Sequence, residues 1–192
     1  MAHSDFRHLT GLILHADADT LCRLAPELAR SIPELGPMIG FDQRSPHHAY
    51  DLFRHTACVT AAVPEDATLR WAALLHDTGK IAAFTLDETG RGHFYGHASH
   101  SAAIAERVLR RLDAPSQLRR DAVKLVELHM TRLEPDKKKL RQWQDRLGAE
   151  GLNRLLLLQE ADMGSKGIPR ERDLSQFARL RQLLAEMRSH TI

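Results

Sequence analysis

Hydrophobic residues recur along most of the chain at intervals of three or four, the spacing that gives a helix one apolar face. Residues from Phe6 to about Ile32 predict two short helices of this kind, with Asp19 as the N-cap of the second. Pro33, Gly36, Pro37 and Gly40 then interrupt the pattern, and Ser45-Pro46 indicates a new helix start. Further helices are expected over about 47–63, 97–112, 115–129, 140–147, 152–163 and 174–187.

One stretch, RWAALLHDTGK from Arg70 to Lys80, departs from this pattern because its helix is apolar on every side. Such a helix has no broad face for water and is expected to lie inside the protein. It would carry His76 and Asp77 into the interior. A buried carboxylate without a partner costs several kcal/mol. We therefore expect Asp77 to have either a basic partner or a metal cation beside it.

The only strand signal lies after Lys80. The segments AFTL and HFY lie on either side of the turn-rich segment DETGRG. Together the three segments predict a small hairpin near residues 83–95. No internal repeat or low-complexity tract is present. The expected fold is an all-α helical bundle with this one β-hairpin, formed as a single domain over residues 1–192.

Composition limits the number of domains, the role of the cysteines and the expected cellular location. The chain has 192 residues and 43% hydrophobic content, enough for one buried core. Cys22 and Cys58 are far apart and lack Cys-x-x-Cys spacing, which argues against a disulfide framework or a thiolate zinc site. No secretory pattern and no membrane-length apolar run is seen, so a cytoplasmic protein without membrane contact is expected.

The net charge of +2 excludes a strongly basic nucleic-acid coat. Basic residues nevertheless outnumber acidic ones between Arg107 and Arg141. A solvated helix face is the favoured interpretation, and an anionic ligand such as RNA is the alternative. Four histidines near the ends, His3, His8, His15 and His190, are expected at the surface.

Residues able to bind a metal occupy the apolar faces of five separate predicted helices. They are His55, the His76-Asp77 doublet, His97 with His100, His129, and Asp162. One lone inward histidine is weak evidence, but a single shared cation would satisfy all of them. On its helix His48 lies nearly above His55, where it would be a core residue or would orient a ligand.

Imidazole and carboxylate ligands without thiolate favour a divalent metal held for chemistry, with Mn, Fe, Co, Ni, Zn and Mg all compatible. Such a cation acts as a Lewis acid on a phosphoryl oxygen and supplies hydroxide near neutral pH. Asp77 could bridge to a second cation about 3.5–4 Å away. His97, His100 and His129 would complete that second metal site or contact the phosphate, and Lys80 would offset phosphate charge.

At these residues the sequence resembles the HD-domain metal-dependent phosphohydrolases. His55 in YDLFRHT, His76 and Asp77 in LLHDTGK, and Asp162 in QEADM match the metal ligands of that family in order. The phrases SPHHAYDLFRHT, RWAALLHDTGK, HFYGHASHSA and VELHM are similar to the HD region of bacterial CCA-adding tRNA nucleotidyltransferases. This likeness covers roughly residues 20–165 and leaves 166–192 as a C-terminal helical extension.

The resemblance implies hydrolysis of phosphomonoesters or 2',3'-cyclic phosphodiesters by attack of a metal-bound hydroxide, with Asp77 and Lys80 as catalytic residues. The substrate would be a phosphorylated small molecule or nucleotide, or the end of tRNA or another RNA. The tRNA enzymes also carry a nucleotidyltransferase head with Gly-Ser and paired-aspartate motifs, which this sequence lacks, so CCA addition is not expected. Two alternatives remain: a non-catalytic module that binds tRNA or a partner protein, and a structural metal or buried ion network.

Overall fold

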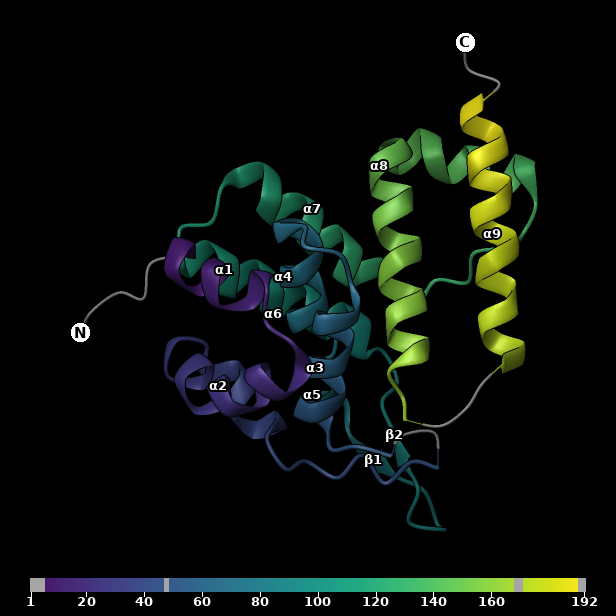
Figure 1. Ribbon diagram of the computed structural model, residues 1–192. Coiled ribbons are helices and arrows are strands. Elements are labelled where there is room, and N and C mark those ends of the chain that lie inside the picture. Colours follow the sequence, from purple (N-terminus) through teal and green to yellow (C-terminus); the bar gives the residue numbers. More distant parts are fainter. Residues whose placement is uncertain (1–5, 47–48, 168–170, 190–192) are drawn as a thin grey trace.

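The computed structural model describes residues 6–46, 49–167 and 171–189, and this part of the chain forms nine α-helices, one 3-10 helix and one two-stranded sheet (Figure 1). The helices are α1 (Phe6–Leu14), α2 (Ala18–Ser31), η1 (Pro33–Met38), α3 (Leu52–Ala62), α4 (Ala67–Leu75), α5 (Lys80–Ala83), α6 (His97–Arg111), α7 (Ser116–Leu128), α8 (Lys137–Gly164) and α9 (Glu171–Ser189). The predicted all-α fold is confirmed.

Helix α4 lies at the centre of the bundle, as its apolar sequence predicts. Every residue from Thr68 to Leu75 is buried, and the helix contacts α1, α3, α6, α7 and α8. Trp71 is completely buried, stacks on Phe6 and donates its indole N–H to Thr10 Oγ1 at 2.9 Å. The Asp66 side chain caps the helix by accepting from the Leu69 amide at 2.9 Å. The end of α4 is therefore held deep inside the protein.

Two predicted helix starts differ from the structure. Helix α2 is capped by Asp17, which accepts from the Thr20 amide, whereas Asp19 lies in the first turn and forms an ion pair with Arg54. The reason is backbone conformation, because Asp17 is the last extended residue before the helix.

Helix α3 begins at Leu52 instead of near residue 47. Asp51 is its N-cap and accepts from the Arg54 amide at 2.9 Å. Residues 41–45 are not helical, and the Arg44 carbonyl accepts from the Gly92 amide of the hairpin. His47 and His48 lie outside the described residues, as do His3 and His190, while His8 and His15 are exposed as expected.

The hairpin forms where it is predicted, but its strands are short. Strand β1 (Thr85–Leu86) pairs antiparallel with β2 (Gly92–His93), in the register Thr85 to His93 and Leu86 to Gly92. Ala83, the first residue of the predicted first strand, is instead the last residue of α5 (Lys80–Ala83). The hairpin lies at the same end of the bundle as α5 (Figure 1).

The two helices predicted over 140–147 and 152–163 are both present and share the label α8, because they meet at Gly148, where the backbone leaves the helical conformation. Gly148 has a φ of 72° and a ψ of 165°, a conformation that glycine adopts without steric cost. Helix α9 lies alongside α8 and buries Phe177, Leu180 and Leu183 (Figure 1). The C-terminal extension therefore packs on the helix that carries Asp162.

Two surface properties bear on partners. No helix in the described ranges combines the length and the apolarity needed to cross a bilayer. Several basic residues between Arg107 and Arg141 pair with carboxylates of the same chain: Arg110 with Glu106, Arg111 with Glu34, Lys124 with Glu127, and Lys139 with Glu134. This pairing favours the interpretation of that segment as a solvated surface.

Candidate metal centre

The predicted metal-binding residues form one buried cluster, in which three histidines are oriented by the same kind of local hydrogen bond. The Nδ1 atoms of His76, His97 and His129 donate to backbone carbonyls three residues earlier, at 2.7, 2.8 and 2.6 Å. A carbonyl oxygen can only accept, so the neutral ring carries its proton on Nδ1. Each Nε2 is therefore left as a lone pair, which is the form that binds a metal.

The fourth histidine is oriented by a distant segment. His55 Nδ1 contacts the carbonyl oxygen of Ser165 at 3.2 Å, and Ser165 follows the last residue of α8. His55 Nε2 then lies 3.0 Å from Asp162 Oδ1. The C-terminal end of α8 thus contributes both the Asp162 carboxylate and the carbonyl that orients an imidazole on α3. Ser165 could not be predicted from the sequence, because a backbone acceptor leaves no signal in side-chain type.

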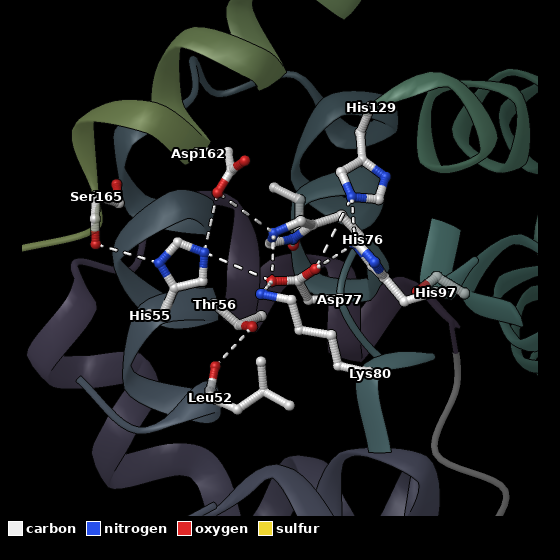
Figure 2. A network of polar contacts seen from close by, with 12 residues as sticks. Leu52, His55, Thr56, His76, Asp77, Lys80, His97, His129, Asp162 and Ser165 are labelled. Atoms are coloured by element: carbon white, nitrogen blue, oxygen red, sulfur yellow. Dashed lines mark hydrogen bonds and ion pairs between the residues drawn. The ribbon is translucent and has the colours of Figure 1, made fainter. Parts of the chain in front are cut away.

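Asp77 lies at the centre of the cluster, between two groups of imidazoles (Figure 2). Its Oδ2 atom lies 3.2 Å from His76 Nε2 and 3.6 Å from His55 Nε2. Its Oδ1 atom lies 3.3 Å from His97 Nε2 and 3.8 Å from His129 Nε2. The ligand atoms within each of these trios lie within 4.8 Å of one another. The structure therefore brings together two potential cation sites that share the Asp77 carboxylate.

The environment of these atoms fits a divalent cation. His76 Nε2 is fully buried and, within the part of the chain that the structure describes, has no hydrogen-bond partner. Asp77 Oδ2, which lies 3.2 Å from His76 Nε2, is also an acceptor, so either a proton on the ring or a metal cation must lie between the two atoms. In addition, α4 and α7 end immediately before His76 and His129, and the C-terminal end of a helix carries partial negative charge. A cation between these groups would relieve both effects.

The protonation states are consistent with this arrangement. Burial opposes charge on Asp77, but the positive charges of His76 and Lys80 hold the pKa of its carboxyl well below the usual range. Burial likewise opposes charge on His76, yet the neighbouring Asp77 carboxylate raises the pKa of that imidazole. Burial lowers the pKa of His129 to about 4, so His129 is neutral at physiological pH. Asp162 is ionised, because hydrogen bonding from His55 and the charge of Lys166 lower its pKa against the effect of burial.

Two lysines lie next to the carboxylates. Lys80 is buried, with its Nζ atom 2.8 Å from Asp77 Oδ2, and it donates to Gln43 Oε1 at 2.9 Å. Lys166 Nζ lies 3.7 Å from Asp162 Oδ2. Lys80 was predicted from the sequence as a site residue, whereas Gln43 and Lys166 were not. The only available signal for Lys166 was its position one helical turn after Asp162 in the loop GSKG.

His100 is the one site residue from the sequence analysis that the structure does not bring into the cluster. His97, the first residue of α6, reaches Asp77, whereas His100 is exposed. His100 lies three residues after His97, which places its Cα about 4.5 Å further along the helix axis. The same face of α6 therefore places one imidazole against Asp77 at the start of the helix and leaves another exposed one turn later.

Gly79 explains how the turn after Asp77 packs so closely on α6. A Cβ atom at this position would lie 2.4 Å from the His97 carbonyl oxygen and 2.5 Å from the Ser101 nitrogen. The Gly79 amide donates to Ser101 Oγ at 2.8 Å. The missing side chain thus lets the Asp77 turn contact the helix that begins with His97.

A cavity of about 240 Å³ leads to the cluster. Asp77, His97 and Asp162 line it together with three cationic side chains, Lys80, Arg91 and Lys166. A second cavity of about 160 Å³ shares Met130, Asp162 and Lys166 with the first and is bounded by Phe177 and Leu180 of α9. The cationic lining gives the first cavity the chemistry to receive an anion such as a phosphate.

Fold and site together define an all-α protein built around a buried histidine and aspartate cluster of the kind that holds divalent metals. The family model of the HD domain matches residues 47–163. The chain belongs to the HD domain family.

Known relatives share this region. The chain is 36% identical over 154 residues to the A-adding tRNA nucleotidyltransferase of Deinococcus radiodurans, covering 77% of this chain and 35% of the relative. It is 34% identical over 148 residues to the CC-adding tRNA nucleotidyltransferase of Thermus thermophilus, covering 73% and 33%. It is 38% identical over 109 residues to the multifunctional CCA protein of Azoarcus sp., covering 53% and 25%. The chain thus matches only about a third or less of the length of these relatives.

Proposed function

We propose that the protein is a metal-dependent phosphohydrolase that acts on phosphomonoesters or 2',3'-cyclic phosphodiesters of nucleotides or RNA ends. The observation that carries this proposal is the position of Asp77, whose two carboxylate oxygens face separate groups of imidazole lone pairs at the base of a cationic cavity. One or two divalent cations, drawn from Mn, Fe, Co, Ni, Zn and Mg, suit these ligands.

His55, His76, Asp77 and Asp162 would hold the first cation, and His97 and His129 would hold a second one through Asp77. A bound cation supplies Lewis acidity toward phosphoryl oxygens and a water of lowered pKa as the nucleophile.

The remaining groups of the cavity act on the substrate. Lys166 and Arg91 line its wall and would bind the phosphate oxygens. Lys80, held between Gln43 Oε1 and Asp77 Oδ2, would present a fixed positive charge to the phosphoryl group. The side chains of His55, His76 and Asp77 are buried, and charges interact more strongly in such an environment than in water.

A second function has one observation in its favour. The relatives reported above are named as tRNA nucleotidyltransferases, so the chain could serve as a non-catalytic module that binds tRNA. The buried ligand set argues for catalysis, because binding a nucleic-acid backbone does not require inward-facing carboxylates.

The test is hydrolysis of p-nitrophenyl phosphate and of 2',3'-cyclic AMP by protein loaded with Mn²⁺, Co²⁺ or Ni²⁺ in turn. We expect turnover that is lost by at least ~100-fold in Asp77→Asn, which keeps the side-chain shape but removes the bridging charge. Asp145→Asn, an exposed carboxylate change on α8, is the matched control and should leave turnover unchanged. Full activity in Asp77→Asn contradicts the proposal. Salt-dependent tRNA binding by a protein without turnover would support the binding module instead.

A further inference from the structure

Tyr95 is the most exposed of the large hydrophobic residues that the structure describes, with 79% of its surface accessible. It lines the cavity that leads to Asp77, together with Met130, which is 61% exposed. Single exposed apolar side chains are ordinary on protein surfaces. These two differ because both border the same cavity of about 240 Å³, which also contains Asp77 and three cationic side chains.

The orientation of the Tyr95 ring is fixed by a neighbouring stack. Its ring is parallel to the imidazole of His93, with the centroids 5.4 Å apart and 8° between the planes. His93 Nε2 in turn lies 2.9 Å from Asp87 Oδ2. Asp87 itself accepts from the Thr89 and Arg91 amides of the hairpin turn. The aromatic ring is therefore held in place by the hairpin and still presents most of its surface to solvent.

The chain connects this ring directly to the cluster. Gly96, with a φ of +74°, forms the turn between Tyr95 and His97, and His97 donates back to the Phe94 carbonyl. Met130 directly follows His129. The two exposed side chains thus lie within two residues of the two imidazoles that face Asp77 Oδ1. If a phosphate ester binds with its phosphate next to Asp77, the esterified group would extend toward the opening, where Tyr95 and Met130 line the wall.

We propose that Tyr95 is a stacking platform for the base of a nucleoside phosphate, with Met130 as a second apolar contact at the same opening. This inference rests on the proposed function and assigns the residue that would distinguish nucleotides from other phosphate esters. Flat aromatic bases stack on exposed aromatic rings without regard to base identity. The phosphate contacts Lys80, Arg91 and Lys166 while the base lies on the Tyr95 ring. The ligand is therefore a nucleotide, either free or at the end of an RNA chain.

The first test compares hydrolysis of adenosine 3'-monophosphate with that of glycerol 2-phosphate by the metal-loaded protein. Tyr95→Ala is expected to lower kcat/KM for the nucleotide ~10-fold and to leave glycerol 2-phosphate unchanged, because only the nucleotide has a base to stack. Tyr95→Phe retains the ring and should behave as the wild type. Leu86→Ala, a change at a 50% exposed residue of the same hairpin, is the control and should change neither substrate.

A binding measurement separates this inference from the hydrolase proposal. Calorimetry on the metal-loaded protein should show tighter binding of adenosine 3'-monophosphate than of ribose 5-phosphate, and Tyr95→Ala should abolish the difference. Equal affinities in the wild type, including the absence of binding to both, overturn the inference. So does an equal loss for both ligands in Tyr95→Ala. Absence of turnover with any ester overturns the hydrolase proposal, while a Tyr95-dependent preference for the nucleotide would still stand.

A 3'-phosphorylated trinucleotide distinguishes the two sources of the base. A higher kcat/KM for the trinucleotide than for the mononucleotide assigns the platform to RNA ends, and the reverse assigns it to free nucleotides. Either result supports the inference if Tyr95→Ala makes the kcat/KM values of the two substrates equal. If the difference in kcat/KM persists in Tyr95→Ala, the inference is overturned.

Discussion

The Nε2 atoms of His97 and His129 lie 3.2 Å apart, although both rings have their Nδ1 atoms hydrogen-bonded to backbone carbonyls. In the neutral tautomers these contacts define, two lone pairs face each other, an arrangement that needs a proton or a metal ion between them. Burial lowers the pKa of His129 to about 4, so that ring is neutral at neutral pH. A divalent cation between the two Nε2 atoms would satisfy both lone pairs.

Removing one of these imidazoles should change the metal stoichiometry. We expect wild-type protein to bind two divalent cations per chain, His129→Ala to bind one, and Asp77→Ala to bind none with comparable affinity, since Asp77 faces both trios. Elemental analysis after dialysis against Mn²⁺ or Co²⁺ measures this. His100→Ala, which changes an exposed imidazole on α6, is the control and should bind as the wild type does. Equal metal content in His129→Ala and the wild type would contradict the two-cation arrangement.

Metal affinity should depend on pH with a defined sign. The Asp77 carboxylate raises the pKa of His76, so in the metal-free protein this ring keeps its proton to higher pH than a free imidazole. Metal binding displaces that proton, and the affinity therefore rises with pH until His76 is unprotonated and falls as the pH is lowered. His129, with a pKa of about 4, adds no slope between about pH 5 and 8.

Calorimetry with Co²⁺ at several pH values between about 5.5 and 8, in buffers of different ionisation enthalpy, would count the protons released. We expect about one proton per cation at the acid end of this range, decreasing as the pH rises. An affinity that does not change with pH would show that His76 is not a ligand.

Gly79→Ala should damage both the fold and the site. The added methyl group would lie 2.4 Å from the His97 carbonyl and 2.5 Å from the Ser101 nitrogen, both of which are backbone atoms that move only with α6. We expect a loss of about 2 kcal/mol or more in the free energy of unfolding, with weakened metal binding because His97 begins the displaced helix. Gly11→Ala is the control, since apart from its chain neighbours and the backbone of its own helix α1 no atom lies within 4 Å of its Cβ position. This variant should gain about 0.5–1 kcal/mol. Urea denaturation of both variants measures the difference.

Arg70 has a structural role in the core. Its buried guanidinium donates to the carbonyl oxygens of Ile13, Ala16 and Pro64 near the ends of α1 and α3. Arg70→Met would leave these acceptors without donors and should lower the free energy of unfolding by about 2–4 kcal/mol, measured by urea denaturation. Arg110→Met removes an exposed pair with Glu106 and should cost at most about 1 kcal/mol. Equal effects of the two changes would contradict the assigned role.

Local features of the chain were predictable because they depend on residues close in sequence. The apolar run through Trp71 indicated a buried helix before His76, and the turn residues after Asp87 indicated the hairpin. The N-cap of α2 was predicted at Asp19, two residues too late, because several polar residues in a row can each cap a helix. Only the backbone conformation distinguishes among them.

The amino-acid sequence by itself determined that the protein is helical, that α4 is buried, and that histidine and aspartate side chains occupy apolar faces, because periodicity and side-chain chemistry are local properties. The tertiary structure decided which of these side chains meet. It placed His97 against Asp77 and left His100 exposed, paired Lys80 with Gln43, and brought Ser165 to His55. These contacts depend on where one helix starts or ends relative to another, and helix packing sets that relation across more than a hundred residues of chain.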